Sequence, residues 1–181
     1  MKNVCDYDTN FDESVFLSRV DRIFIMILDS IMDRDMSSVK HYLSNDLYKK
    51  YDKLVTSYIN DHKIRLFDEM NVKSTSIDGF NINDNKINIE VTLTSRYMDY
   101  FVNEDGKYLN GINDHRIEKL HHLVLTKRLD AKPLEEARRC PSCGNTLDIN
   151  NTGICPYCNH TFNMEDYDYI LTSMESGYDN W

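Results

Sequence analysis

The chain has 181 residues, which is enough for one ordinary domain and a small additional module. Hydrophobic residues make up 41% of it, and the low content of glycine (six) and proline (three) excludes collagen-like and long disordered chains. The formal net charge is −9, and the excess of acid is most marked near the C-terminus, because no Lys or Arg follows Arg139.

Residues 1–10 are acidic and polar, and they predict a flexible N-terminus. A long helix is predicted over residues 11–34, with Thr9 or Asn10 as its N-cap. Its apolar residues recur at spacings of three and four, which places them on one buried face. These residues are Phe16, Val20, Ile23, Phe24, Ile27, Leu28 and Ile31.

A short helix is predicted from Ser37 to Leu43, and Asn45 is the expected cap of a third helix. The third helix has a helical apolar stripe that predicts its buried face. The stripe consists of Leu47, Tyr51, Leu54, Val55 and Tyr58.

The hydrophobic period changes from helical to alternating after residue 64. Strands are predicted over residues 64–78, 87–101 and 116–129, with a turn at 103–106 between the last two. Helices that precede a run of strands predict an α+β domain over residues 11–130, with the helices packed on one face of a curved antiparallel sheet. A linker is expected over 131–139, followed by a separate C-terminal module over 140–181.

The C-terminal module contains two CxxC pairs separated by eleven residues. A pair with two intervening residues directs both sulfurs at one point, so two pairs complete a tetrahedral zinc site. Two disulfides or four free thiols are the alternatives, and disulfides are disfavoured in the reducing cytoplasm where a chain without an apolar leader is expected. We therefore predict one structural Zn²⁺ held by Cys140, Cys143, Cys155 and Cys158 in a compact ribbon.

Two further residues of ligand type, a histidine and a cysteine, are not needed for the predicted zinc site. His160 is able to replace one sulfur ligand, although four cysteines already suffice, and Cys5 lies outside the pattern. A closed four-cysteine site leaves no position for a substrate, so we expect no catalysis at this metal.

Nucleic acid is not an expected partner of the ribbon, because Lys and Arg are needed to neutralise phosphates. A basic group does occur before it, at Arg116, Lys119, Lys127 and Arg128. These residues are interspersed with acids, and we expect them to form a solvated face.

The C-terminal sequence and several upstream segments resemble a known family. The ribbon and its tail carry the most specific part of the resemblance, and the upstream segments agree in order. The matching segments are Cys140–Cys158, Glu165–Ser173, Asp46–Tyr48, Asp99–Tyr100, Gly106 and Gly111. The chain is similar to bacterial zinc-ribbon members of the TIM-forty-four-like family, the relatives of the mitochondrial import-motor anchor. The resemblance implies a nuclear-transport-factor-2-like cone and a role linked to protein transport.

The resemblance leads us to expect a non-enzymatic adaptor that binds a protein or peptide, with a small apolar ligand as another candidate for the cone. The tail could dock such a partner through Tyr167, Tyr169 and Ile170, or it could complete the core instead. No membrane-spanning segment is predicted, since the longest apolar run, residues 23–28, is too short.

The alternative function is acid–base catalysis in a pocket of the cone, which some proteins of this fold perform. The candidate pocket residues are Tyr97, Asp99, Tyr100, His115, His121 and His122. His121 and His122 are adjacent in a strand and face opposite sides, so at most one of them lines a pocket.

Overall fold

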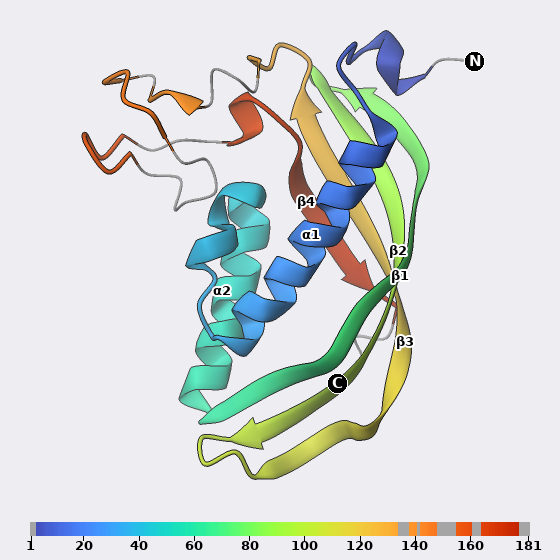
Figure 1. The fold of residues 1–181 in the computed structure, drawn as a ribbon, viewed down its shortest axis with the longest axis vertical. Helices are drawn as coiled ribbons and strands as arrows, with labels where there is room; N and C mark the ends of the chain where they lie inside the picture. The colour runs from blue at the N-terminus through green and yellow to red at the C-terminus, as the bar shows by residue number, and fades with distance from the viewer. Residues whose placement is uncertain (1–2, 134–137, 141, 148–154, 161–163, 178–181) are drawn as a thin grey trace.

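The structure is a computed structural model that describes residues 3–133, 138–140, 142–147, 155–160 and 164–177. Its helices and strands follow the predicted order, with one additional strand at the end (Figure 1). The elements are η1 (Val4–Asp6), α1 (Glu13–Met32), η2 (Ser37–Tyr42), α2 (Asn45–Asn60), β1 (Lys63–Asn83), β2 (Lys86–Asn103), β3 (Tyr108–Arg128), η4 (Met164–Asp166) and β4 (Ile170–Ser176).

Helix α1 buries the seven apolar residues that its sequence pattern predicts. Its N-cap is Asp12, whose side chain accepts a hydrogen bond from the Val15 backbone N–H at 2.9 Å, so the predicted cap at Thr9 or Asn10 is wrong. The helix begins later because the residues before it close a separate turn, in which the Phe11 N–H donates to the Asp8 carbonyl at 3.0 Å.

The second helical region consists of the 3-10 helix η2 and helix α2. Ser44 caps α2 by accepting a hydrogen bond from the Leu47 N–H at 3.3 Å, and Asn45 is the first helical residue instead of the predicted cap. The stripe predicted for this helix faces the core, with Leu54 only partly buried.

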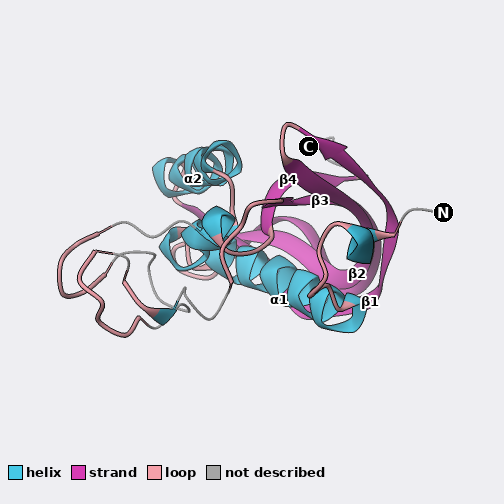
Figure 2. Cartoon of the chain, turned by 90° about the horizontal axis from the view of Figure 1, so that it is seen from above, coloured by secondary structure: helices cyan, strands magenta, loops and turns pink. Residues whose placement is uncertain are grey.

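The four strands form one antiparallel sheet in the order β1-β2-β3-β4. Side chains alternate along β2, so Ile87, Ile89, Val91 and Leu93 are buried on the face that meets the helices. Figure 2, seen along the molecule from above, shows the sheet curling round α1, with α2 beyond the open side. The predicted α+β cone is confirmed.

The sheet bends most strongly beside Met98, where both neighbours of β2 carry extra residues. The register of β1 shifts between Asp68 and Asn71, and Glu69 there has a left-handed φ of 51°. In β3, residues 113–116 are inserted opposite Met98, since Tyr97 pairs with Ile117 while Asp99 pairs with Ile112. Bulges bend a strand, so these irregularities turn the lower sheet towards the end of α2 (Figure 1).

Strand β4 lies within residues 140–181, which were predicted to form a C-terminal module separate from the cone. It pairs with β3, from His121 opposite Ser176 to Thr126 opposite Ile170, and it buries Leu171 and Met174 against the helices. Its outer edge is partly covered, because the Ser44 N–H donates to the Leu171 carbonyl at 2.9 Å. The cysteine-containing segment therefore connects two neighbouring strands of one sheet.

Candidate functional site

The four predicted ligand cysteines converge at one point of the structure. Their Sγ atoms all lie within 4.8 Å of one another, with Cys140 and Cys158 at 3.5 Å and Cys143 and Cys155 at 3.7 Å. These separations are too long for disulfide bonds, whose sulfurs lie about 2 Å apart. They agree with the edge of about 3.8 Å that four thiolates have around a metal at about 2.3 Å. The cluster can hold one metal ion.

The two CxxC turns have the same backbone geometry. In the first turn the Gly144 N–H donates to the Cys140 carbonyl, and in the second the Asn159 N–H donates to the Cys155 carbonyl, both at 2.9 Å. Gly144 and Asn159 are left-handed, with φ values of 74° and 56°. Glycine and asparagine tolerate this conformation best, which explains why these residue types follow the second cysteine of each pair.

The thiols of this cluster titrate unequally. Burial raises the pKa of Cys140, but N–H groups of Cys143 and Ser142 outweigh burial and lower the pKa to about 6. At Cys158 the His160 N–H lowers the pKa, but burial and the neighbouring thiols raise it to about 11. Four adjacent thiolates repel one another, so a cation is required to keep all four deprotonated near neutral pH.

The cysteine module, defined here as residues 138–160, is anchored to the cone on both of its sides. Before it, the Lys132 N–H donates to the Asp166 carbonyl at 2.9 Å. After it, Glu165 is paired with Lys86 of β2, and Asp166 lies 3.6 Å from Arg128 at the end of β3. The two chain segments that lead to and from the module are thus held together at the end of β3.

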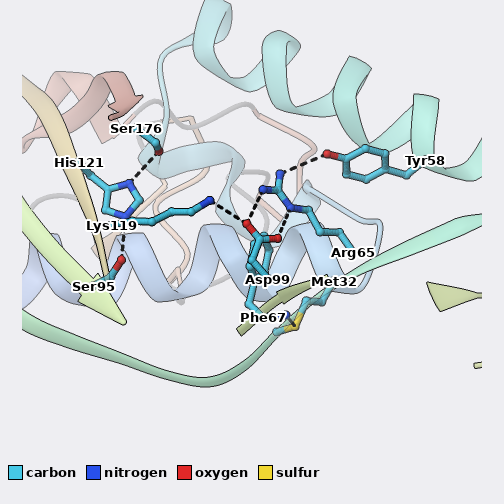
Figure 3. Close-up of polar contacts among 9 residues, drawn as sticks. All are labelled: Met32, Tyr58, Arg65, Phe67, Ser95, Asp99, Lys119, His121 and Ser176. Carbon is cyan, nitrogen blue, oxygen red and sulfur yellow. Dashed lines mark hydrogen bonds and ion pairs between the residues drawn. The ribbon is translucent and has the colours of Figure 1, made fainter. Parts of the chain in front are cut away.

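A buried charge cluster occupies the lower part of the cone (Figure 3). The Asp99 carboxylate accepts two hydrogen bonds from Arg65 and one from Lys119, all at 2.8 Å. Burial raises the pKa of Asp99, but these two cations outweigh it, so that the pKa lies below its ordinary value. Asp99 is therefore an ionised structural partner of two cations, a poor arrangement for a general base.

His121 forms a second buried polar group on the same face of the sheet (Figure 3). Its Nε2 lies 2.7 Å from Ser95 Oγ, its Nδ1 lies 2.8 Å from Ser176 Oγ, and its ring packs on Phe24 at 4.7 Å. Burial, and then the charge of Lys119, lower its pKa to about 4. The imidazole is consequently neutral and fixed between two hydroxyls.

The structure divides the predicted pocket residues between the two faces of the sheet. Tyr97, Asp99 and His121 are buried on the face that meets the helices. His122 is exposed on the other face, where it lies 3.3 Å from Thr92 Oγ1, and Tyr100 is paired there with Asp68. His115 is exposed and lies 2.7 Å from Asp114. None of these residues lines the groove that is described below.

The residues proposed to dock a partner from the tail are buried. Tyr167, Tyr169 and Ile170 are each no more than 5% exposed, and Tyr169 packs edge-on against Phe16 of α1 at 5.1 Å. The partner-surface interpretation is therefore replaced by the other interpretation, in which this segment completes the core.

A groove lies at the end of the cone where α1 begins. It is a half-open hollow of about 490 Å³. Its rim carries two exposed apolar side chains, Val15 (67% exposed) and Leu129 (36%). Deeper in, Lys127 and Arg19 are paired with Asp8 and Asp168 respectively. The groove thus combines apolar contacts with groups able to form hydrogen bonds.

Sequence reasoning missed Lys119, which was assigned to a solvated face but is only 5% exposed. A signal was present, because Lys119 has the same parity along β3 as His121, Leu123 and Leu125, which are all buried. Lys127 was assigned to the same solvated face but is only 18% exposed and pairs with Asp8, and Arg65 was missed, because nothing in the local pattern identifies Asp8 and Asp99 as their partners.

Comparison with known families agrees with this architecture. The sequence model of the Tim44-like domain family matches residues 1–135, which is more than half of the chain. The chain belongs to the Tim44-like domain family. This is the family that the sequence resembles, and the match covers the helices and β1 to β3 of the cone. In this Tim44-like protein, the cysteine module and β4 follow the matched segment.

No curated protein matches the chain. Within the part of the chain that the structure describes, every helix is too short or too polar to span a lipid bilayer.

Proposed function

We propose that the protein is a non-enzymatic adaptor that binds a polypeptide segment in the groove at the end of its Tim44-like cone. Tim44-like domains are associated with protein translocation, and this association supports polypeptide as the class of ligand. The observation that carries the proposal is the groove itself, with Val15 and Leu129 exposed on its rim.

The composition of the groove favours a polypeptide over a small apolar ligand. A peptide backbone needs hydrogen-bond donors and acceptors at its binding site, because an unpaired buried amide costs about 1–3 kcal/mol. Charged side chains of both signs line the groove beside its apolar ones, including Asp12, Arg19 and Lys132. Arg19 is paired with Asp168 and Asp12 accepts a hydrogen bond from the Val15 N–H, but a purely apolar ligand would still displace water from the remaining polar positions of these side chains.

The arrangement of the titratable groups supports the non-enzymatic part of the proposal. Asp99 is paired with two cations, and both nitrogens of His121 are within hydrogen-bond distance of serine hydroxyls. Acid–base catalysis requires a group with a free position for the substrate proton. We therefore assign both residues a structural role.

We further propose that the four cysteines hold one structural Zn²⁺. Four sulfurs in a closed tetrahedron are typical of structural zinc sites, and the described part of the cysteine module has only Leu147 as a buried apolar side chain besides Cys140 and Cys155. Elemental analysis of the purified chain should find one zinc per chain, and Cys143→Ser should abolish stoichiometric binding. Iron in place of zinc, or no metal in a chain with reduced cysteines, would contradict this assignment.

Peptide binding is tested by selecting displayed random peptides on the full chain. We expect the selected peptides to lose at least tenfold in affinity when Val15→Ser and Leu129→Ser are combined, because apolar contacts on the rim are removed. A matched control combines Ile59→Ser and Leu109→Ser, two residues of similar exposure (45% and 48%) that do not line the groove. The proposal fails if no peptide is selected or if only the control pair weakens binding.

A further inference from the structure

The N-terminal strap, defined here as residues 3–12, lies beside the groove and forms one of its walls. Figure 1 shows it at the top of the molecule, crossing from the N-terminus to the start of α1. Among the described residues, every backbone hydrogen bond made by residues 3–11 is internal to the strap. Examples are the Tyr7 and Asp8 N–H groups, which both donate to the Val4 carbonyl at 2.9 Å. Side chains alone therefore attach the strap to the cone.

The buried Val4 side chain, which is 4% exposed, and two aromatic rings provide the apolar part of this attachment. The Tyr7 ring packs edge-on against Phe80 of β1, with centroids 6.1 Å apart. The Phe11 ring contacts Phe16 of α1 at 5.3 Å and Tyr169 at 6.1 Å. Tyr7 and Phe11 therefore contact aromatic rings from β1, from α1 and from the segment just before β4.

One buried ion pair provides the polar part. Asp8 Oδ2 lies 2.8 Å from Lys127 Nζ and 3.2 Å from the Tyr169 hydroxyl. The Lys127 side chain is only 18% exposed, and within the described residues it has no other acidic partner. If the strap were lifted away, the ammonium would lose its counter-charge and keep only the Tyr169 ring, whose centroid lies 5.4 Å away. The surface beneath the strap therefore demands a carboxylate between two apolar contacts.

We infer that this surface, the strap seat, is an exchangeable binding site for an acidic–aromatic polypeptide segment. The segment would carry an aromatic residue followed directly by an acid, with a second aromatic three residues later, as Tyr7, Asp8 and Phe11 do. The inference rests on the proposed function, because it specifies the chemistry of the polypeptide that binds at this end of the cone. In the free protein the strap occupies the seat itself.

The attachment by side chains makes exchange physically accessible. Segments with few backbone hydrogen bonds to the rest of a fold open locally at a lower free energy than core elements do. The groove borders residues 7–12 of the strap, so an incoming segment can contact the cone before the strap leaves. A bound partner then competes with the covalently tethered strap, whose effective concentration is high.

The test uses the full chain and a fluorescent peptide of residues 3–12 with serine in place of Cys5. We expect the peptide to bind Asp8→Asn protein at least tenfold more tightly than wild-type protein, because the tethered strap is weakened and the free peptide keeps its carboxylate. Asp105→Asn is the matched control: it makes the same charge change in the exposed turn between β2 and β3, and its affinity should equal that of wild type.

The acid requirement is tested separately. A peptide that itself carries Asp8→Asn should bind at least tenfold more weakly than the original peptide, and adding Lys127→Met to the Asp8→Asn protein should remove that difference. Equal affinity of the two peptides, or no saturable binding to a folded Asp8→Asn protein, overturns the inference. If groove-dependent peptides from the display selection lack the acidic–aromatic pattern and leave the strap in place, the inference fails while the proposed function stands.

Hydrogen exchange of wild-type protein provides a measurement that needs no variant. We expect the amides of residues 4–11 to exchange at least a hundredfold faster than those in the middle of α1, through local opening of the strap. Protection equal to that of α1 would show that the strap is a fixed part of the core and would overturn the inference.

Discussion

His121 Nδ1 lies 2.8 Å from Ser176 Oγ, so a partly buried hydrogen bond joins the strand before the cysteine module to the strand after it. The imidazole is neutral in this position, since its pKa is lowered to about 4. Its neighbour His122 is exposed on the other face of the sheet. The two histidines provide a matched pair for testing how the last strand is attached.

The stability of the fold should depend on pH through His121. The unfolded chain takes up a proton near pH 6.5, whereas the folded chain takes it up only near pH 4, so stability is full above pH 6.5 and is lost as the pH falls. Between pH 7.5 and 5 the loss should be about 2 kcal/mol. Urea denaturation at several pH values measures this dependence of the free energy of unfolding on pH. The dependence should disappear in His121→Gln and persist in His122→Gln. An unchanged pH dependence in His121→Gln would show that His121 is not its source.

Asp99 should be the most sensitive member of the buried charge cluster. Asp99→Asn leaves Arg65 and Lys119 without a counter-charge, and we expect it to lower the free energy of unfolding by about 3–5 kcal/mol. Lys119→Met should cost less, about 1 kcal/mol, because Asp99 keeps its two bonds to Arg65. The exposed Asp114→Asn is the control, and thermal denaturation should show no appreciable change in its stability. Equal losses for Asp99→Asn and Asp114→Asn would contradict this account.

Metal loss should loosen β4 as well as the cysteine module. The module connects β3 to β4, so loss of the metal removes a constraint between these two strands and the short last strand loses support. After Cys143→Ser or treatment with a chelator, hydrogen exchange should rise at residues 138–160 and at Ile170–Ser176, while α1 and β1–β3 remain protected. Cys5→Ser is the matched control and should change neither the metal content nor the exchange.

An increase in exchange confined to residues 138–160 would show that β4 is independent of the metal. Global unfolding on chelation would also disagree with this account, because α1, β2 and β3, which supply most of the buried core, contain no cysteine and only Cys140 and Cys155 join that core from the module.

Gly111 is required where β3 passes close to β2. Its φ is +106°, and a Cβ there would lie 2.5 Å from the Asp99 carbonyl oxygen and 2.5 Å from the Tyr100 Cα. Gly111→Ala should therefore lower stability by about 2 kcal/mol or more. Gly79→Ala meets open space and should be neutral or stabilising by about 0.5 kcal/mol in urea denaturation. A similar effect of the two substitutions would mean that the approach at Gly111 is not tight.

Periodicity and spacing predicted the parts of the fold that are encoded locally. The alternation from Ile87 to Leu93 is sufficient to define β2 and its buried face, because side chains of a strand point to opposite sides in turn. The two CxxC turns likewise contain their own geometry, and the four sulfurs meet where the spacing predicts.

Long-range pairing could not be predicted from the same signals. Strand β4 is only seven residues long, and its Ile170-Leu171-Thr172-Ser173 start does not alternate, so only the open edge of β3 makes it a strand. The strap and its Asp8–Lys127 pair join residues 119 positions apart, and no local pattern specifies such a partner. The N-cap of α1 was predicted at the wrong residue because several acidic and polar residues before the helix are suitable caps. The turn from Asp8 to Phe11 determines which of them caps the helix, and the local sequence does not reveal that turn.

Polypeptide binding in the groove is tested most directly by site-specific photocrosslinking of the full chain. A photoreactive amino acid is placed either at Leu129, on the rim of the groove, or at Leu109, an exposed leucine that does not line it. With a peptide selected on the wild-type chain, we expect a crosslink from position 129 and none from position 109. A crosslink from position 109 alone would place the bound polypeptide elsewhere and contradict the account.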